Sequence, residues 1–149
     1  MRATFKVDDT AVRAYFSNLD KRIHEEVLRN ANQLKEDLIQ LVQTKLSGQV
    51  LQQRSGRLYG SIEGDVYDAG TRRVTVEVRS RGVVYARIQE YGGDVYPVNA
   101  TYLHFVLEDG REIFSKHVRV PERSYLRSSL DREKIREEMK RAVREATRP

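Results

Sequence analysis

The chain has 149 residues, of which 39% are hydrophobic and 33% are charged, and 27 Lys and Arg against 22 Asp and Glu give a formal net charge of +5. This length predicts one domain, residues 1–149, with a buried core, and the absence of Cys excludes disulfides, Cys-based zinc sites and thiol nucleophiles. No stretch reaches the roughly 20 apolar residues of a membrane helix, and the charged first nine residues lack a secretory signal's apolar core, so we expect a mature start and no membrane partner.

A long amphipathic helix is predicted over residues 9–46. Apolar residues recur there at steps of mainly three and four, and Asp8, Asp9 and Thr10 supply capping oxygens. A helix of this length is unusual in a globular domain, so we expect a break at 17–20, where Ser, Asn and Asp cluster. Gly48 ends the helix. The apolar stripe is typical of a core or subunit-packing face.

The pattern changes to strands over residues 62–120. Val74, Val76 and Val78 alternate with polar residues, and the segment 68–71 predicts a hairpin turn. A third apolar run, residues 83–89, ends at paired glycines, and we assign it to the same sheet.

A second hairpin is predicted over residues 102–120. Asp109 and Gly110 form a strong two-residue turn signal, which would place Phe105 opposite Phe114. Both faces of this hairpin are then partly apolar. Two alternatives follow: the hairpin projects and a neighbour completes it, or it lies under the C-terminal segment.

A final helix is predicted over residues 124–147, with Ser124 as its cap and sparse apolar positions beyond its first turns. The order of elements predicts an α+β fold. We expect an antiparallel sheet of about four to five strands, with the N-terminal and C-terminal helices packed on one face and the second hairpin projecting.

Residues that could support catalysis or bind a metal are few. In the predicted register His104 and His117 share a face of the hairpin, but two ligands without a third make a weak metal site. Glu90 and Asp94 bracket a glycine turn like a carboxylate pair, yet no spacing rule distinguishes them from other acids. We therefore expect no enzyme activity, no metal and no cofactor.

The charge is distributed unevenly. Residues 1–110 hold 15 basic and 15 acidic side chains, whereas residues 111–149 hold 12 and 7, so the whole excess is C-terminal. A solvated helix face with interleaved signs is one interpretation, and a docking surface for an acidic protein neighbour is another. Eight Tyr, four Phe and many Arg also leave open a small basic nucleic-acid-binding module. The arginines around the sheet loops are at positions Arg54, Arg57, Arg72, Arg73, Arg79, Arg81 and Arg87.

Three short segments carry a family resemblance. Residues 55–62 (S-G-R-L-Y-G-S-I) are similar to the pattern T/S-G-x-L-x-x-S-I, and residues 85–92 (Y-A-R-I-Q-E-Y-G) to Y-A-x-x-x-E-F/Y-G. Residues 118–127 (V-R-V-P-E-R-S-Y-L-R) are similar to I/V-P-x-R-P-F/Y-L-R, with Ser124 in place of the usual proline. In this order, after a long helix, they resemble the head–tail joining or tail-completion proteins of tailed bacteriophages, also called neck, minor tail or virion-morphogenesis proteins of the lambda Z and Mu G type.

The resemblance implies a structural virion protein without catalysis, assembled in the host cytoplasm as a ring subunit at the neck. A hexamer is the first expectation and a dodecamer the second. The implied partners are further copies of the chain, the phage connector or head-completion protein, and the tail terminator or tail tube protein, with DNA passing through the lumen without sequence-specific binding. The interface residues that we select are Arg57, Tyr91, Glu108, Asp109, Gly110, Arg123, Tyr125 and Arg127. For the aromatic residues among them, burial in the core is the alternative.

Overall fold

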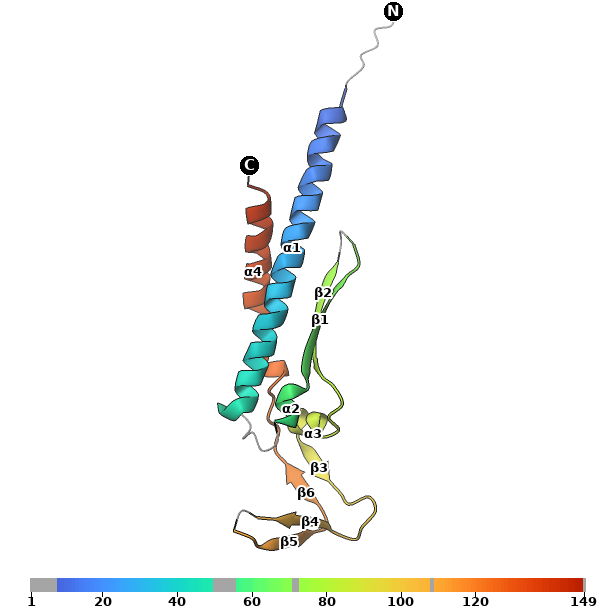
Figure 1. Cartoon of the computed structure of the whole chain (residues 1–149), viewed down its shortest axis with the longest axis vertical. Helices are drawn as coiled ribbons and strands as arrows, with labels where there is room; N and C mark the ends of the chain where they lie inside the picture. The colour runs from blue at the N-terminus through green and yellow to red at the C-terminus, as the bar shows by residue number, and fades with distance from the viewer. Residues whose placement is uncertain (1–7, 50–55, 71–72, 108, 149) are drawn as a thin grey trace, which may run out of the picture. The chain divides into compact units, whose positions relative to one another are not determined.

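The computed structural model of the chain describes residues 8–49, 56–70, 73–107 and 109–148 (Figure 1). They form helices and small antiparallel sheets, which confirms the predicted α+β class. The chain divides into two compact units. Unit one draws on residues 1–39, 64–78 and 131–149, and unit two on residues 40–63 and 79–130. The assignment of one domain to the whole chain stays a prediction.

The N-terminal helix, α1 (Thr10–Thr44), is continuous, and a wider turn, Lys45–Gln49, ends it at Gly48 as predicted. The predicted break at residues 17–20 is wrong. Ser, Asn and Asp each weaken a helix interior by only a fraction of a kcal/mol, roughly 0.7 at most, which is too little to interrupt a long hydrogen-bonded ladder. The cap lies where the sequence predicts it, since the Asp8 carboxylate accepts the Thr10 N–H at 3.0 Å.

Unit one places a strand ribbon and the C-terminal helix beside α1 (Figure 1). The ribbon consists of β1 (Ile62–Asp68) and β2 (Val74–Ser80), and His24 Nε2 of α1 lies 3.0 Å from Asp68 Oδ2. The C-terminal helix, α4 (Arg132–Ala146), runs along α1, where the Arg22 guanidinium donates to the Arg148 carbonyl at 3.1 Å. In this unit α4 thus packs on a helix, which differs from the predicted packing of both helices on one sheet face.

The start of α4 also differs from the predicted start at residue 124. Asp131 is its cap, because its carboxylate accepts the N–H groups of Glu133 and Lys134, each at 3.1 Å. Ser124 binds elsewhere in unit two, and a short 3₁₀ turn, Arg127–Ser129, separates it from the helix.

Unit two contains four short strands and two short helices, α2 (Arg57–Gly60) and α3 (Ala86–Tyr91). Strand β3 (Gly93–Val95) pairs with β6 (Val118–Val120), and β4 (Leu103–Val106) pairs with β5 (Glu112–Ser115). With β1 and β2, the described strands form three separate two-stranded sheets, so the predicted single sheet of four to five strands is wrong.

Two local features explain the difference between the predicted sheet and the observed sheets. The segment 111–120, predicted as one strand, breaks after β5, where the Ser115 hydroxyl donates to the His117 carbonyl. The apolar run 83–89, assigned to the sheet, instead leads into α3, because short apolar runs fit either period and long-range contacts of Glu90 decide between them.

Among the described residues of both units, the buried apolar side chains are few. Unit one buries alanines at its helix contacts, and unit two buries larger residues around α2 and the end of α1. They are Ala31, Ala142 and Ala146 in unit one, and Val42, Leu46, Leu58, Ile62 and Tyr125 in unit two. Among the described residues, no helix combines the length and apolar composition needed to cross a bilayer.

Candidate functional site

A buried carboxylate, Glu90, holds the segment that precedes the C-terminal helix. Glu90 lies near the end of α3, and only 4% of its surface is exposed. Its oxygens accept the backbone N–H groups of Tyr125, Leu126 and Arg127 at 2.9, 2.8 and 2.9 Å. The Ser124 hydroxyl and the Arg127 Nε each donate to it at 3.1 Å. We call Glu90 and residues 124–127 the Glu90 clamp.

The donors of the Glu90 clamp keep a buried carboxylate charged. Burial by itself raises the pKa of Glu90, but the N–H groups of Leu126 and Arg127, with the Arg127 and Ser124 side chains, outweigh it and the pKa is lowered. The hydrogen bond to Glu90 in turn raises the pKa of Arg127. Asp94, the other carboxylate considered from the sequence, lies on β3 opposite Arg119. The hydrogen-bond donors around Glu90 give this carboxylate a structural role.

Tyr125 is a core residue of the clamp. Its surface is 2% exposed, and its hydroxyl donates to the Ala86 carbonyl at 3.4 Å. Burial, followed by the charge of Glu90, raises the pKa of the Tyr125 hydroxyl to about 12. The selection of Tyr125 as an interface residue is therefore wrong, since the chain itself covers its side chain.

The three segments that carry the family resemblance meet around this core. The Ser61 and Ser80 hydroxyls lie 2.8 Å apart, and the Arg81 N–H donates to the Ser61 carbonyl at 2.9 Å. The Ser80 side chain also lowers the pKa of the Tyr125 hydroxyl, so the two side chains are close and the first segment lies near the third. Glu90 joins the second to the third, so the described part of residues 55–62, 85–92 and 118–127 forms one cluster. Ser55 lies outside the described residues.

An exposed aromatic and a cation lie over the clamp. Tyr91 is 55% exposed, and the Arg127 guanidinium carbon lies 4.4 Å from the centre of its ring. Arg127 Nη2 also lies 2.5 Å from Glu122 Oε1. Glu90, Glu122 and Tyr91 together hold the Arg127 guanidinium in place, and we call this surface the Tyr91 patch (Tyr91, Glu122 and Arg127).

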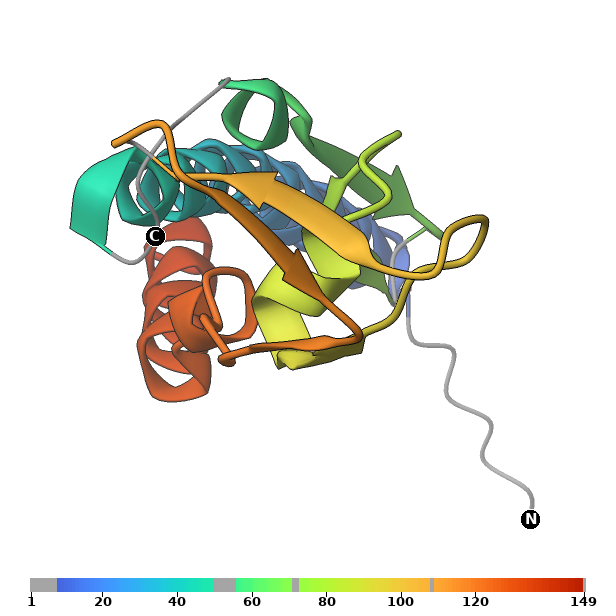
Figure 2. The same ribbon diagram turned by 90° about the horizontal axis from the view of Figure 1, so that it is seen from below.

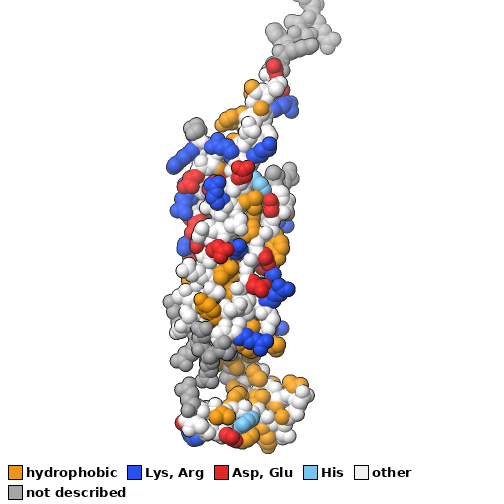
Figure 3. Space-filling view, viewed as in Figure 1, with side chains coloured by type: hydrophobic (Ala, Val, Ile, Leu, Met, Phe, Trp, Pro, Cys, Tyr) orange, Lys and Arg blue, Asp and Glu red, His pale blue; other side chains and the backbone are white. Residues whose placement is uncertain are grey.

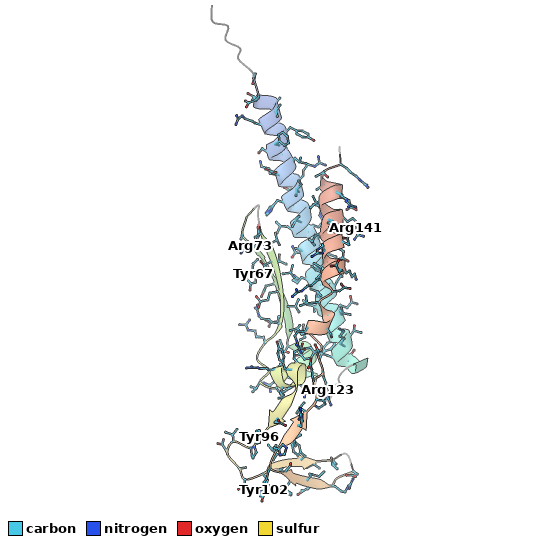
Figure 4. The ribbon with its side chains drawn as sticks, turned by 180° about the vertical axis from the view of Figure 1, so that it is seen from behind. Tyr67, Arg73, Tyr96, Tyr102, Arg123 and Arg141 are labelled. Atoms are coloured by element: carbon cyan, nitrogen blue, oxygen red, sulfur yellow. The ribbon has the colours of Figure 1, made fainter. Side chains whose placement is uncertain are left out.

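The other selected arginines differ in their surroundings. Arg123, labelled in Figure 4, donates its N–H to the Gln89 carbonyl at 3.0 Å and its guanidinium to Gln89 Oε1 at 3.4 Å, which places it next to the Tyr91 patch. Arg57 is exposed at the start of α2, and in the described part of the chain no hydrogen bond or ion pair joins it to that patch.

The β4–β5 hairpin pairs one residue away from the predicted register. Phe105 faces Ile113, and His104 faces Phe114. The turn contains three residues instead of two, because the Leu107 N–H donates to the Arg111 carbonyl at 2.8 Å and Gly110 adopts a φ of 80°. A left-handed glycine at the end of a three-residue loop is a common alternative to the two-residue turn.

The new register separates the two hairpin histidines. His104 stacks on Phe114 with ring centres 4.7 Å apart, whereas His117 stacks on Tyr96 at 5.8 Å. Their predicted shared face is wrong, because a one-residue shift exchanges the side chains on the two faces of a strand. Within residues 8–49, 56–70, 73–107 and 109–148, no group of three or more His, Cys, Asp or Glu could hold a metal ion.

The tip of this hairpin satisfies its own polar groups. The Asp109 carboxylate accepts the Arg111 N–H at 3.1 Å and pairs with the Arg111 Nε at 2.7 Å. The N–H of Arg111 is the main reason that the pKa of Asp109 is lowered. Asp109 and Gly110 thus shape the turn, and Glu108, also selected as a contact residue, lies outside the described residues.

Apolar side chains are exposed on both faces of the β4–β5 hairpin. Phe105 and Ile113 are 40% and 43% exposed on one face, and Val106 and Phe114 are 60% and 62% exposed on the other. Figure 3 shows hydrophobic side chains gathered over this hairpin, and Figure 2 shows no other element of unit two in front of it. Tyr96 and Tyr102, labelled in Figure 4, extend the exposed aromatic surface.

A further exposed apolar surface lies at the start of α1. Val12, Tyr15 and Phe16 are 56%, 60% and 57% exposed, and Leu19 continues the same helical stripe. We call these four residues the Phe16 patch. Sequence reasoning treated the whole stripe of residues 9–46 as one packing face. The length of the predicted helix indicates that part of the stripe is exposed, since one small unit rarely covers ten turns of helix.

The chain matches no protein-family model, no curated protein sequence and no solved structure. A functional conclusion therefore depends on the residues and their geometry.

Proposed function

We propose that this chain is a structural virion protein of a tailed bacteriophage, a ring subunit of the neck or tail-completion layer that joins the portal connector to the tail. It contributes surface to the DNA passage and performs no catalysis. Its neighbours are further copies of itself, the connector or head-completion protein, and the tail terminator or tail tube protein. Assembly takes place in the host cytoplasm, and the mature location is the virion neck.

The observation that carries this proposal is the meeting of the three resemblance segments in one cluster. Segments that match a family pattern by chance have no reason to share hydrogen bonds. In this chain Glu90 accepts hydrogen bonds from the third segment and so connects it to the second, and Ser61 pairs with Ser80, whose side chain lies close to Tyr125 of the third. Glu90, the acidic residue of the second pattern, and Tyr125, the aromatic residue of the third, thus belong to the same hydrogen-bonded cluster.

Exposed surfaces in unit two support an assembling subunit. Exposed apolar side chains that cluster on a protein surface can mark a protein interface. The β4–β5 hairpin exposes Phe105, Ile113 and Phe114, and the Tyr91 patch holds an aromatic–arginine pair in place. Tyr and Arg are enriched among the residues that dominate interface energies.

The decisive experiment images the purified chain and the particles that contain it. Negative-stain electron microscopy of the chain is expected to show rings, first as hexamers of about 104 kDa, six times the 17.3 kDa chain mass. Antibody labelling of phage particles is expected at the junction of head and tail. A stable monomer that binds neither heads nor tails overturns the proposal.

DNA binding separates the proposal from a nucleic-acid-binding module. A ring subunit that only lines a passage binds free DNA weakly. A module that grips phosphates binds tightly, and its log affinity falls with log salt by about 0.9 for each phosphate contacted. Fluorescence anisotropy with a short duplex, measured across a salt series, distinguishes the two. Tight binding with a steep slope would replace the proposed function by the second one.

A further inference from the structure

The charge changes along the C-terminal helix. Residues 131–138, the cap and first turns of α4, hold four acidic and three basic side chains, whereas residues 139–148 hold one acidic and four basic ones. The second group therefore carries a formal charge of +3, which is most of the excess of +5 in the whole chain. Its basic members are Lys140, Arg141, Arg144 and Arg148. We call these four residues the basic face.

The residues of the basic face lie on one side of the segment. Ala142 and Ala146 are 1% and 7% exposed, so they mark the packed side of α4. Steps of three and four residues join positions 140, 141, 144 and 148, which places them on the opposite side, and all four are exposed. Figure 3 shows Lys and Arg side chains gathered over this end of α4, and Arg141 is labelled in Figure 4.

The acidic side chains nearby neutralise only part of this charge. Lys140 Nζ lies 2.7 Å from Glu137 Oε1. The hydrogen bond from Lys140 lowers the pKa of Glu137, and the charge of Arg144 adds to the effect. Arg141 and Arg148 have no ion-pair partner within the described part of the chain. The basic face therefore keeps a net positive charge.

The basic face offers charge without an apolar anchor. The large apolar side chain exposed next to it is Val143, 38% exposed, which lies at its edge and not among the cations. Protein interfaces are usually centred on aromatic or apolar anchors and are depleted of charge at their core. Contacts to a nucleic-acid backbone are instead electrostatic and independent of sequence. The composition of the face therefore favours phosphate over an acidic protein as its partner.

The length of the basic face also fits a phosphate backbone. Residues 140 to 148 span roughly 12 Å along the axis at a helical rise of 1.5 Å per residue. One strand of duplex DNA carries a phosphate about every 3.4 Å of its axis, so this span covers about three to four phosphates. The end of the segment is held in place, because the Arg22 guanidinium of α1 donates to the Arg148 carbonyl at 3.1 Å.

We propose that the basic face binds the phosphate backbone of duplex DNA without reading its sequence. Arginine suits this role, because its planar guanidinium donates two parallel hydrogen bonds to phosphate oxygens. Cations at a helix C-terminus also stabilise the helix dipole, but that effect is confined to the last turn, and Lys140 and Arg141 precede it.

The inference rests on the proposed function for the place of the DNA, and it identifies the surface that faces the passage. Binding of free DNA stays weak, within the nonspecific range of about 10⁻⁴–10⁻⁶ M at physiological salt, since few phosphates are contacted. The basic face can nevertheless be tested in the single chain.

The test removes the three arginines of the basic face together, as Arg141→Gln, Arg144→Gln and Arg148→Gln. Fluorescence anisotropy with a labelled 20-base-pair duplex measures binding across a salt series. Three lost phosphate contacts are expected to lower the slope of log affinity against log salt by about 2.7. The part of the salt dependence that disappears is about fortyfold between 50 and 200 mM salt.

The matched control removes the same charge from the first turns of the same helix, as Arg132→Gln, Lys134→Gln and Arg136→Gln. These residues are exposed and alternate with acidic side chains, and Arg136 pairs with Glu133 at 3.2 Å. The control is expected to keep the slope of the unaltered chain. Far-ultraviolet circular dichroism confirms that both variants retain their helices, since Gln is a good helix former.

Three results overturn the inference. They are an unaltered chain that does not bind the duplex at 50 mM salt, a slope that is unchanged without the three arginines, and equal losses of slope in the two triple variants. Tighter binding of a labelled poly-glutamate peptide than of the duplex, lost in the same arginine variant, also overturns it and identifies an acidic protein as the partner.

The inference and the proposed function can fail separately. Arginine-dependent DNA binding by a chain that forms no ring and is absent from virions supports the inference and removes the proposed function. Labelling at the virion neck, together with a slope that does not depend on the three arginines, supports the proposed function and overturns the inference.

Discussion

The Glu90 clamp and the β4–β5 hairpin lie in the same unit, but they differ in which side chains they bury and which they expose. In the clamp a carboxylate is 4% exposed, and a set of hydrogen-bond donors surrounds it. In the hairpin Phe105 and Phe114 are 40% and 62% exposed, and they lie on different faces. One region buries a charge, and the other exposes aromatic rings.

The difference separates folding from assembly. A buried charge is stable only where hydrogen-bond partners surround it, and in the clamp the chain itself supplies all of these partners. An isolated two-stranded hairpin is marginal in water, so the proposed function assigns the stabilisation of β4–β5 to a neighbouring subunit. We therefore expect clamp substitutions to change the stability of the single chain, and hairpin substitutions to change mainly its association.

The largest effect is expected from Glu90→Ala. The change leaves the N–H groups of Tyr125, Leu126 and Arg127 without their acceptor in a buried position, which typically costs about 3–5 kcal/mol of unfolding free energy. Urea unfolding followed by circular dichroism measures it. The matched control is Asp94→Ala on exposed β3, where a loss of about 1 kcal/mol or less is expected. Equal losses of unfolding free energy in both variants would show that the clamp contributes no more to stability than an exposed strand.

Two glycines, Gly92 beside the clamp and Gly110 at the hairpin tip, test the same difference between clamp and hairpin through the backbone. A Cβ at Gly92 would lie 2.7 Å from the Glu122 backbone nitrogen, and the dihedral angles there, φ 67° and ψ −174°, belong to a region that is almost exclusive to glycine. Gly92→Ala is expected to cost about 2–4 kcal/mol.

The control for Gly92 is Gly110 at the hairpin tip. Gly110 also has a positive φ, 80°, but apart from its chain neighbours no atom of the described residues lies within 4 Å of the added Cβ. Gly110→Ala is therefore expected to cost only the backbone strain, about 1–2 kcal/mol, in the same urea titration. A Gly110→Ala loss as large as that of Gly92→Ala would show that the hairpin is packed as tightly as the clamp.

Local pattern was sufficient to predict several elements. The three-and-four spacing predicts the helix of residues 9–46, Gly48 predicts its end, and the alternation at Val74, Val76 and Val78 predicts a strand with one polar face. These features depend on neighbours within a few residues. Asp109 and Gly110 likewise identify the β4–β5 turn, although not its length.

Long-range contacts determine the features that local sequence patterns do not predict. The hairpin register depends on a third loop residue, and the helical state of residues 86–91 depends on Glu90 reaching a segment about 35 positions later. The same contact takes Ser124 from its predicted role as a helix cap and makes Tyr125 a core residue. A lone Glu in an apolar run before Gly-Gly was the available signal, but its partners are backbone groups, which no side-chain pattern reveals.

Acid is expected to weaken the clamp selectively. The pKa of Glu90 lies below its ordinary value of 4.5 in the folded chain, so its contribution is complete above that value and is lost as the pH falls through the folded-state pKa. Unfolding midpoints of the chain should therefore fall on acidification below about pH 4.5. Glu90→Gln, which cannot titrate, is expected to flatten this part of the pH profile. An unchanged acid limb in Glu90→Gln would assign the loss to other carboxylates.

The smallest effect on the single chain is expected from Phe114→Ser in the hairpin. Phe114 is 62% exposed and stacks on the ring of His104, so the expected loss is about 0.5–1 kcal/mol, the usual value of one aromatic pair. Urea unfolding at concentrations where the chain is monomeric measures this loss, with Val84→Ser as the exposed control. A loss above 2 kcal/mol would place the hairpin in the folding core. A small loss agrees with the proposed function, in which Phe114 contributes to assembly and not to folding.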